Sequence, residues 1–173
     1  MQEQIHAKNA TIKLGDKWPV VWANDSVLNQ IIINLLTNAL KFVAPNSPPR
    51  IRIWAETSLS SPGGDGPGEE SKIQNEAAPA EIVRLCIEDN GIGISAEMQG
   101  RLFQPFQRGT SDPQYQGTGM GLAIVQKGAE RLGGKVGLTS TPGKGTSFCV
   151  ELLPAHAVES MRADEFPDIA PRR

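Results

Sequence analysis

Two asparagines four residues apart, Asn34 and Asn38, carry side-chain amides that can bind a metal ion or phosphate oxygens. The residues around them are apolar enough to form the core face of a helix. Because an α-helix has about 3.6 residues per turn, both amides and the ammonium of Lys41 would fall on one stripe. Two amides and a cation on one stripe suit a magnesium-bound polyphosphate. A solvated polar stripe on an amphipathic helix is the simpler alternative.

A carboxylate followed by two glycines forms the second group. Asp89 comes directly after the apolar run 82–87, which predicts a β-strand, and Gly91 and Gly93 follow it. A carboxylate at a strand end can accept a hydrogen bond from an exocyclic amine, and glycines let a planar ring approach the backbone. A tight turn with positive φ is the simpler interpretation of the same residues.

A glycine-rich segment that runs into a predicted helix forms the third group. Successive backbone N–H groups at a helix N-terminus bind anions. A dinucleotide-binding turn is disfavoured because this segment follows polar residues and not a strand, and 142–146 lacks the order of a P-loop and is predicted to be a hairpin turn. The residues of this third group are Gly117, Thr118, Gly119, Gly121 and Leu122.

The elements that must position these groups alternate between strand and helix. Their order predicts an α/β fold, a two-layer sandwich with a mixed β-sheet and helices on one face. We expect Asp25 or Ser26 to cap the first long helix. Strands are expected at 10–14, 19–22, 50–57, 81–88, 134–140 and 146–153, and helices at 26–42, 96–101 and 118–132.

The composition predicts one small domain at 1–155 and a linker-like tail at 156–173. The chain has 173 residues, of which 39% are apolar, and a net charge of −2, which argues against a nucleic-acid surface. No apolar run approaches the roughly 20 residues that span a bilayer, so we expect no membrane contact. Segment 58–80 is rich in turn formers, which predicts a flexible insertion, with loop elongation as its simplest role.

Two cysteines, Cys86 and Cys149, fall in predicted strands with no metal-binding or redox spacing. We expect buried, reduced thiols, as is usual in a cytosolic protein. A disulfide between neighbouring strands is the less favoured alternative.

The three groups and the segment 102–106 together, in this order, closely resemble the ATP-binding catalytic domain of bacterial sensor histidine kinases. That superfamily also holds DNA gyrase B, the Hsp90 chaperones and MutL. The resemblance runs from about Thr11 to Leu153. It implies that Asn38 ligates Mg2+ and that Asp89 holds the adenine amino group, helped by the Thr146 hydroxyl.

The resemblance also implies catalytic roles for Asn34, Lys41 and Arg108. Asn34 sits one turn before the metal ligand, Lys41 faces the phosphates, and Arg108 lies where these kinases often carry an arginine that reaches the γ-phosphate. An idle surface arginine is the alternative for Arg108. The glycines on both sides of 102–117 would bind the nucleotide, and 102–117 would be the ATP lid. Since residues 107–116 carry little to bury, we expect nucleotide phosphates to order them.

The position of Asn34 separates the branches of the superfamily. The hydrolysing branches carry a glutamate there that activates water, whereas an amide cannot accept a proton near neutral pH. The resemblance therefore implies transfer of the γ-phosphate from ATP to a histidine. An ATP-hydrolysing clamp and a regulatory nucleotide-binding module, such as an anti-sigma-type serine kinase, are the alternatives.

The acceptor histidine pattern of this family is absent around His6 and His156, and we expect both side chains to be exposed bystanders. The resemblance then implies a histidine-bearing dimerisation domain of the same kinase as partner, with a response regulator downstream. We expect the isolated domain to be monomeric and the full-length kinase homodimeric. The expected location is cytoplasmic, which includes the cytoplasmic part of a membrane-anchored sensor.

Overall fold

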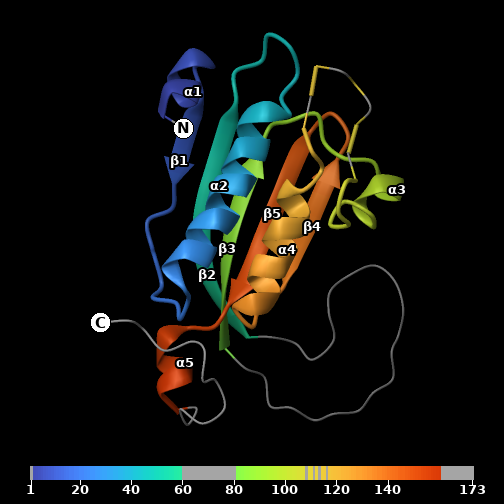
Figure 1. Cartoon of the computed structure of the whole chain (residues 1–173). Helices are drawn as coiled ribbons and strands as arrows, with labels where there is room; N and C mark the ends of the chain where they lie inside the picture. The colour runs from blue at the N-terminus through green and yellow to red at the C-terminus, as the bar shows by residue number, and fades with distance from the viewer. Residues whose placement is uncertain are drawn as a thin grey trace.

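The computed structural model describes residues 2–59, 81–107, 109–110, 112, 114–115 and 117–160 (Figure 1). The elements are α1 (Gln2–Ala7), β1 (Thr11–Leu14), α2 (Asp25–Lys41), β2 (Arg50–Leu59), β3 (Glu81–Asp89), α3 (Ala96–Gln99), α4 (Gly121–Arg131), β4 (Val136–Thr141), β5 (Gly145–Leu152) and α5 (Ala155–Ser160).

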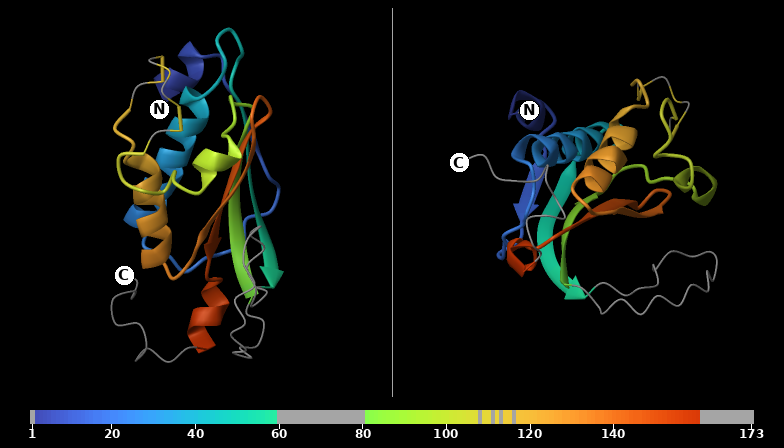
Figure 2. Two further views of the ribbon diagram at one scale, coloured as in Figure 1. Left: turned by 90° about the vertical axis from the view of Figure 1, so that its right-hand side faces the viewer. Right: turned by 60° about the horizontal axis from the view of Figure 1, so that its bottom comes forward.

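The five strands form one mixed sheet in the order β1-β2-β3-β5-β4. β1 runs parallel to β2, and the other neighbours are antiparallel. Figure 2 shows α2 and α4 together on one face of this sheet. The predicted two-layer α/β sandwich is therefore confirmed.

The helix layer is held by a stripe of apolar side chains on α2. Ile31, Leu35 and Ala39 recur every four residues, so they share one face of the helix, and each is at most 1% exposed. α4 approaches this stripe closely, because a Cβ added at Gly128 would lie 2.9 Å from Cγ1 of Ile31. At the other end of α4, Gly121 lies beside Asn34, so the two helices run antiparallel.

One strand predicted from the sequence does not form, and two short helices were not predicted. Segment 19–22 is no strand: it contributes one isolated bridge, between Val21 and Pro154, and Val20 is 75% exposed. α1 and α5 were not expected from the sequence, and both are short helices at the ends of the described chain.

The cap of α2 also differs from the prediction of Asp25 or Ser26. Asn24 is the N-cap, with extended φ and ψ, and its Oδ1 accepts a hydrogen bond from the backbone N–H of Val27 at 3.2 Å. Asn24, Asp25 and Ser26 are all residue types that cap helices, so the sequence alone did not decide which of them is the N-cap.

Several predictions fall largely outside the described residues. In the predicted insertion 58–80, only Ser58 and Leu59 are described, and they continue β2. Of the tail 156–173, the backbone is described to Ser160, within α5. No helix in the described part of the chain has both the length and the apolar composition to cross a membrane.

The prediction of two reduced thiols is wrong, because Cys86 and Cys149 form a disulfide. The two residues are direct partners in the β3–β5 register. They lie on the sheet face away from the helices, since side chains alternate along a strand and the neighbouring Ile87 belongs to the core under α2. The pairing joins residues 63 apart in the sequence, and local patterns do not reveal such a register.

We expect reduction by dithiothreitol to lower the free energy of unfolding by about 2–4 kcal/mol, because the bond closes a long loop in the unfolded chain. Urea unfolding with and without the reductant measures this. The double variant Cys86→Ser, Cys149→Ser is the control and should not respond to the reductant. Equal urea midpoints for the wild type in both conditions, with two titratable thiols, would show that the bond is absent.

Candidate functional site

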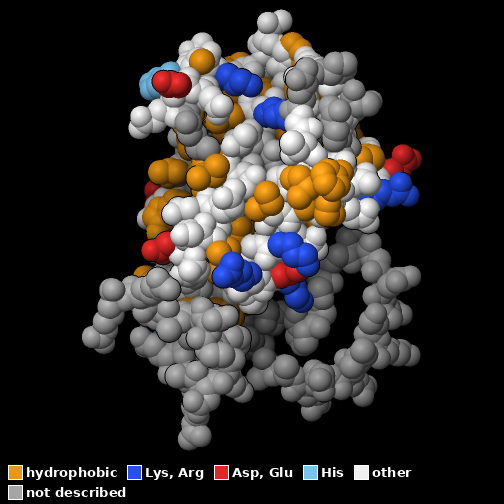
Figure 3. Space-filling model, viewed as in Figure 1, with side chains coloured by type: hydrophobic (Ala, Val, Ile, Leu, Met, Phe, Trp, Pro, Cys, Tyr) orange, Lys and Arg blue, Asp and Glu red, His pale blue; other side chains and the backbone are white. Residues whose placement is uncertain are grey.

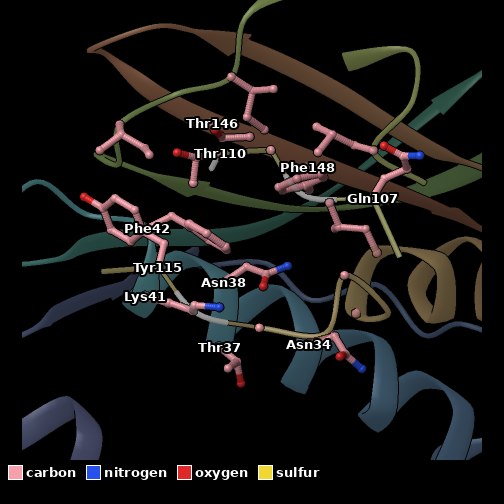
Figure 4. Close-up of a pocket in the computed structure, with 18 of the residues that line it drawn as sticks. Asn34, Thr37, Asn38, Lys41, Phe42, Gln107, Thr110, Tyr115, Thr146 and Phe148 are labelled. Atoms are coloured by element: carbon pink, nitrogen blue, oxygen red, sulfur yellow. The ribbon is translucent and has the colours of Figure 1, made fainter. Parts of the chain in front are cut away.

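A cavity of about 230 Å³ opens where α2 ends, β3 leaves the sheet and α4 begins (Figure 4). It brings together nearly all the residues that the sequence singled out. Gly91 lies behind the wall and not in the lining, and Arg108 is outside the described residues. The predicted residues that line the cavity are Asn34, Asn38, Lys41, Asp89, Gly93, Gly117, Thr118, Gly119, Gly121, Leu122 and Thr146.

Asp89, the last residue of β3, provides a carboxylate at one end of the cavity. Its Oδ1 accepts hydrogen bonds from the backbone N–H groups of Gly91 (2.7 Å) and Thr146 (3.3 Å). Both bonds use Oδ1, so Oδ2 is the oxygen that can serve a ligand. Burial raises the pKa of Asp89 to about 6, although the two N–H donors act to lower it, and the charge of Glu88 adds to the rise.

Thr146 stands beside this carboxylate and is 6% exposed. Its hydroxyl lies 2.9 Å from the hydroxyl of Ser140, which also donates to the carbonyl of Gly145. A hydroxyl has one hydrogen, so Thr146 must be the donor in the Thr146–Ser140 bond. The remaining lone pairs of Thr146 are acceptors, which suits the same amine-bearing ligand as Asp89.

The glycines after Asp89 make room for the turn. The backbone N–H of Gly91 donates to Asp89, so the simpler interpretation of this motif as a turn is correct. A Cβ on Gly91 would overlap the carbonyl oxygen of Phe42. Gly93 has φ +69° and packs on the carbonyl of Thr141, where a side chain would not fit.

The other end of the cavity is formed by the start of α4. The N-cap, Met120, makes no side-chain capping bond, and the first N–H groups of an α-helix have no partner within the helix itself. Gly119, at φ +70°, brings the chain against the backbone of Gln107. Unpaired donors and the helix dipole together favour an anion at this end.

The predicted polar stripe of α2, with Asn34, Asn38 and Lys41, lines the cavity between the two ends. The Nδ2 of Asn34 donates to the carbonyl of Gln30 at 2.7 Å, and its Oδ1 faces Gly121 at the start of α4. Asn38 lies one turn further along α2, with its amide pointing into the cavity (Figure 4). The ammonium of Lys41 lies against Gly117, where an added Cβ would be 2.5 Å from Nζ.

A divalent cation would find few protein ligands here. The described residues hold no group of three or more His, Cys, Asp or Glu side chains that could form a metal cage. Mg2+ needs no such cage, since it is often held by one or two protein oxygens together with substrate phosphates and water. The amide oxygens of Asn34 and Asn38 fit that arrangement.

Three aromatic residues line the cavity without a role predicted from the sequence: Phe42, Tyr115 and Phe148. Phe42 follows Lys41 at the end of α2, and Tyr115 lies in the lid loop. The prediction that the lid carries almost nothing to bury is wrong, since Tyr115 is 6% exposed. The sequence did contain a signal for this burial, since Tyr115 is an aromatic residue in an otherwise polar loop.

The cavity is therefore chemically asymmetric. Hydrogen-bond acceptors and aromatic rings are gathered at the β3 end, and backbone donors, amides and a cation at the α4 end. Such a site suits a ligand with a planar, amine-bearing ring at one end and an anionic group at the other.

Comparison with known proteins gives a consistent result. The family model described as histidine kinase-, DNA gyrase B-, and HSP90-like ATPase matches residues 23–156. Phytochrome-like protein Cph1 of Synechocystis is 33% identical over 86% of this chain and 17% of its own length. Circadian input-output histidine kinase CikA of Synechococcus elongatus is 34% identical over 80% of this chain and 16% of its own length. The chain thus spans about one sixth of these relatives.

Solved structures resemble the fold over most of the chain. Full-length ShkA in complex with AMPPNP matches with a TM-score of 0.61 and 27% identity, covering 88% of this chain and 27% of that one. A nucleotide-free catalytic domain of histidine kinase ThkA matches with a TM-score of 0.61 and 25% identity, covering 88% and 84%.

The raised pKa of Asp89 predicts a pH dependence of stability. The pKa rises on folding from its ordinary value of 3.8 to about 6, so stability is greatest while Asp89 is protonated in both states and falls as the pH rises through this window. We expect the wild type to lose about 2 kcal/mol relative to Asp89→Asn between pH 4 and pH 7, measured by urea unfolding. Parallel stability curves for the two proteins would contradict a buried, titrating Asp89.

Proposed function

We propose that this chain, which belongs to the histidine kinase-, DNA gyrase B- and HSP90-like ATPase family, binds Mg-ATP in the cavity between α2, β3 and α4 and supplies its γ-phosphate to a histidine. The chain corresponds to the catalytic ATPase domain of sensor histidine kinases. The asymmetry of the cavity is the observation that carries the proposal. Its acceptor end fits adenine, and its donor end fits a polyphosphate.

Adenine would occupy the end formed by Asp89 and Thr146. The exocyclic amine of adenine is a donor, and Oδ2 of Asp89 and the Thr146 hydroxyl are the acceptors that face it. Phe42 adds an aromatic wall on the side of α2. Binding of ATP is further supported by the ShkA neighbour, whose structure holds AMPPNP, an ATP analogue.

The phosphates would lie between α2 and the N-terminus of α4. The N–H groups near Gly119 and Gly121 and the ammonium of Lys41 are the donors there. Asn38, supported by Asn34, is the residue that would hold Mg2+, which when bound offsets the phosphate charge.

Phosphoryl transfer is favoured over hydrolysis because the described residues place no carboxylate or histidine at the phosphate end. Among the described lining residues Asp89 is the one carboxylate, and it lies at the adenine end. Asn34 occupies the place from which water would be activated, and its amide is engaged with the carbonyl of Gln30. A bound ATP would therefore keep its γ-phosphate until another nucleophile arrives.

The acceptor would be a histidine on a dimerisation domain of the same kinase, which would then pass the phosphate to a response regulator. The chain spans about one sixth of its curated relatives, which leaves room for such a domain in a longer protein. Apolar side chains are exposed near the phosphate end, with Ile33 at 50% and Ile124 at 37% exposure. Figure 3 shows apolar patches over the helix layer, where a helical partner could dock.

A fusion of this chain to the dimerisation domain of a sensor histidine kinase tests the proposal. With labelled Mg-ATP we expect acid-labile, alkali-stable phosphate on the acceptor histidine. Asn38→Ala should weaken Mg-ATP binding about ten- to a hundredfold, as measured by calorimetry, because the amide oxygen that would bind Mg2+ is lost. Asn29→Ala, an exposed asparagine on the same helix, is the matched control and should bind normally.

The competing outcomes are distinct. Steady phosphate release into water, with no phosphohistidine, would identify a hydrolysing ATPase. Unchanged Mg-ATP affinity in Asn38→Ala would remove the metal-binding role from that residue.

A further inference from the structure

Tyr115 is the single tyrosine of the chain, and it is buried although it lies in the polar lid loop. Its hydroxyl donates to the backbone carbonyl of Val43 at 3.0 Å. Its ring packs on Phe42, with the ring centroids 5.6 Å apart. The lid is therefore joined to the residues just after α2 by a ring contact and a long-range hydrogen bond.

The residue before Val43 is held in a similar way from the other side of the cavity. The carbonyl of Phe42 accepts a hydrogen bond at 2.8 Å from the N–H of Ile92, in the turn that follows Asp89. The carbonyl of Phe42 is thus bound by the turn after Asp89, and the next carbonyl, that of Val43, is bound by the lid. Segment 42–43 is the junction at which these two parts of the site meet.

Lys41 directly precedes this junction. Its ammonium lies 4.7 Å from the centroid of the Phe42 ring and against the backbone of Gly117, two residues after Tyr115. The lid backbone and the Phe42 ring therefore bound the space that the ammonium occupies. If the lid moved away from segment 42–43, the Lys41 ammonium would lose the contact with the lid backbone and keep only the Phe42 ring beside it.

We infer that Tyr115 is a positioning residue: it fastens the lid to the end of α2 and thereby holds Lys41 toward the phosphates of the bound nucleotide. This inference rests on the proposed function, since it assigns Tyr115 a task in Mg-ATP binding. If so, removing the contacts of Tyr115 lowers the affinity only for ligands that carry phosphates, and only while Lys41 is present. A tyrosine that only filled space would affect base and phosphate binding alike.

Three nucleotide-binding measurements separate these possibilities. Tyr115→Phe keeps the ring and loses the bond to Val43, and we expect Mg-ATP to bind about three- to tenfold more weakly. Tyr115→Leu, which also loses the ring contact, should cost more. Adenosine binding, measured by competition with a fluorescent ATP analogue, should be almost equal for the wild type and Tyr115→Phe, which keeps the ring contact with Phe42. Equal losses for adenosine and Mg-ATP would overturn the inference.

A double-mutant cycle tests the link to Lys41. In a Lys41→Met background, Tyr115→Phe should have little further effect on Mg-ATP affinity, because the group it positions is gone. Additive losses would mean that Tyr115 does not act through Lys41.

The fastening itself can be observed without nucleotide. Incorporation of 3-fluorotyrosine labels Tyr115 alone, so one fluorine signal reports its surroundings. We expect a signal displaced from that of free fluorotyrosine, and a phenol whose pKa is raised, mainly by burial and further by Asp112. A narrow signal at the chemical shift of free fluorotyrosine would refute the contact between Tyr115 and the end of α2. A displaced signal in a wild-type protein that does not bind Mg-ATP would refute the proposed function instead.

Discussion

The buried carboxylate of Asp89 is the constraint on which the site depends. Its Oδ1 is held by two backbone N–H groups, one from the following turn and one from β5. The neighbouring Asn90 adds bonds to the N–H of Arg50 and the carbonyl of Pro48. The place where β3 leaves the sheet is therefore fixed by hydrogen bonds on both sides. One carboxylate oxygen remains for a ligand, at the cost of burying a charge.

One end of the cavity presents hydrogen-bond acceptors and the other presents donors, because different elements form the two ends. One end is formed by the ends of β3 and α2, which present carbonyls, a carboxylate and an aromatic ring. The other end is formed by the start of α4, which presents N–H groups. Because α2 and α4 run antiparallel and touch at Ile31 and Gly128, the stripe of α2 faces the first turn of α4. The core packing of the helix layer thus sets the spacing of the site.

Local patterns were sufficient for the elements that carry the site. Periodic apolar residues and adjacent glycines placed α2, β3 and β5 to within two residues, and the motif residues were assigned from their order along the chain. Features that depend on contacts between distant segments could not be predicted. The Cys86–Cys149 pair requires the β3–β5 register, and the role of Tyr115 requires Val43, 72 residues away.

Calorimetric titration of ATP and GTP into the wild type and Asp89→Asn tests the central claim most directly. Guanine has a carbonyl where adenine has its amine, so the wild type should prefer ATP by about 2–4 kcal/mol, roughly thirty- to a thousandfold. In the variant the amide oxygen must replace Oδ1 to satisfy Gly91 and Thr146, which turns the amide nitrogen toward the base. We therefore expect Asp89→Asn to weaken ATP binding and to narrow or reverse the preference for ATP over GTP. An unchanged ATP-to-GTP ratio in the variant would contradict it.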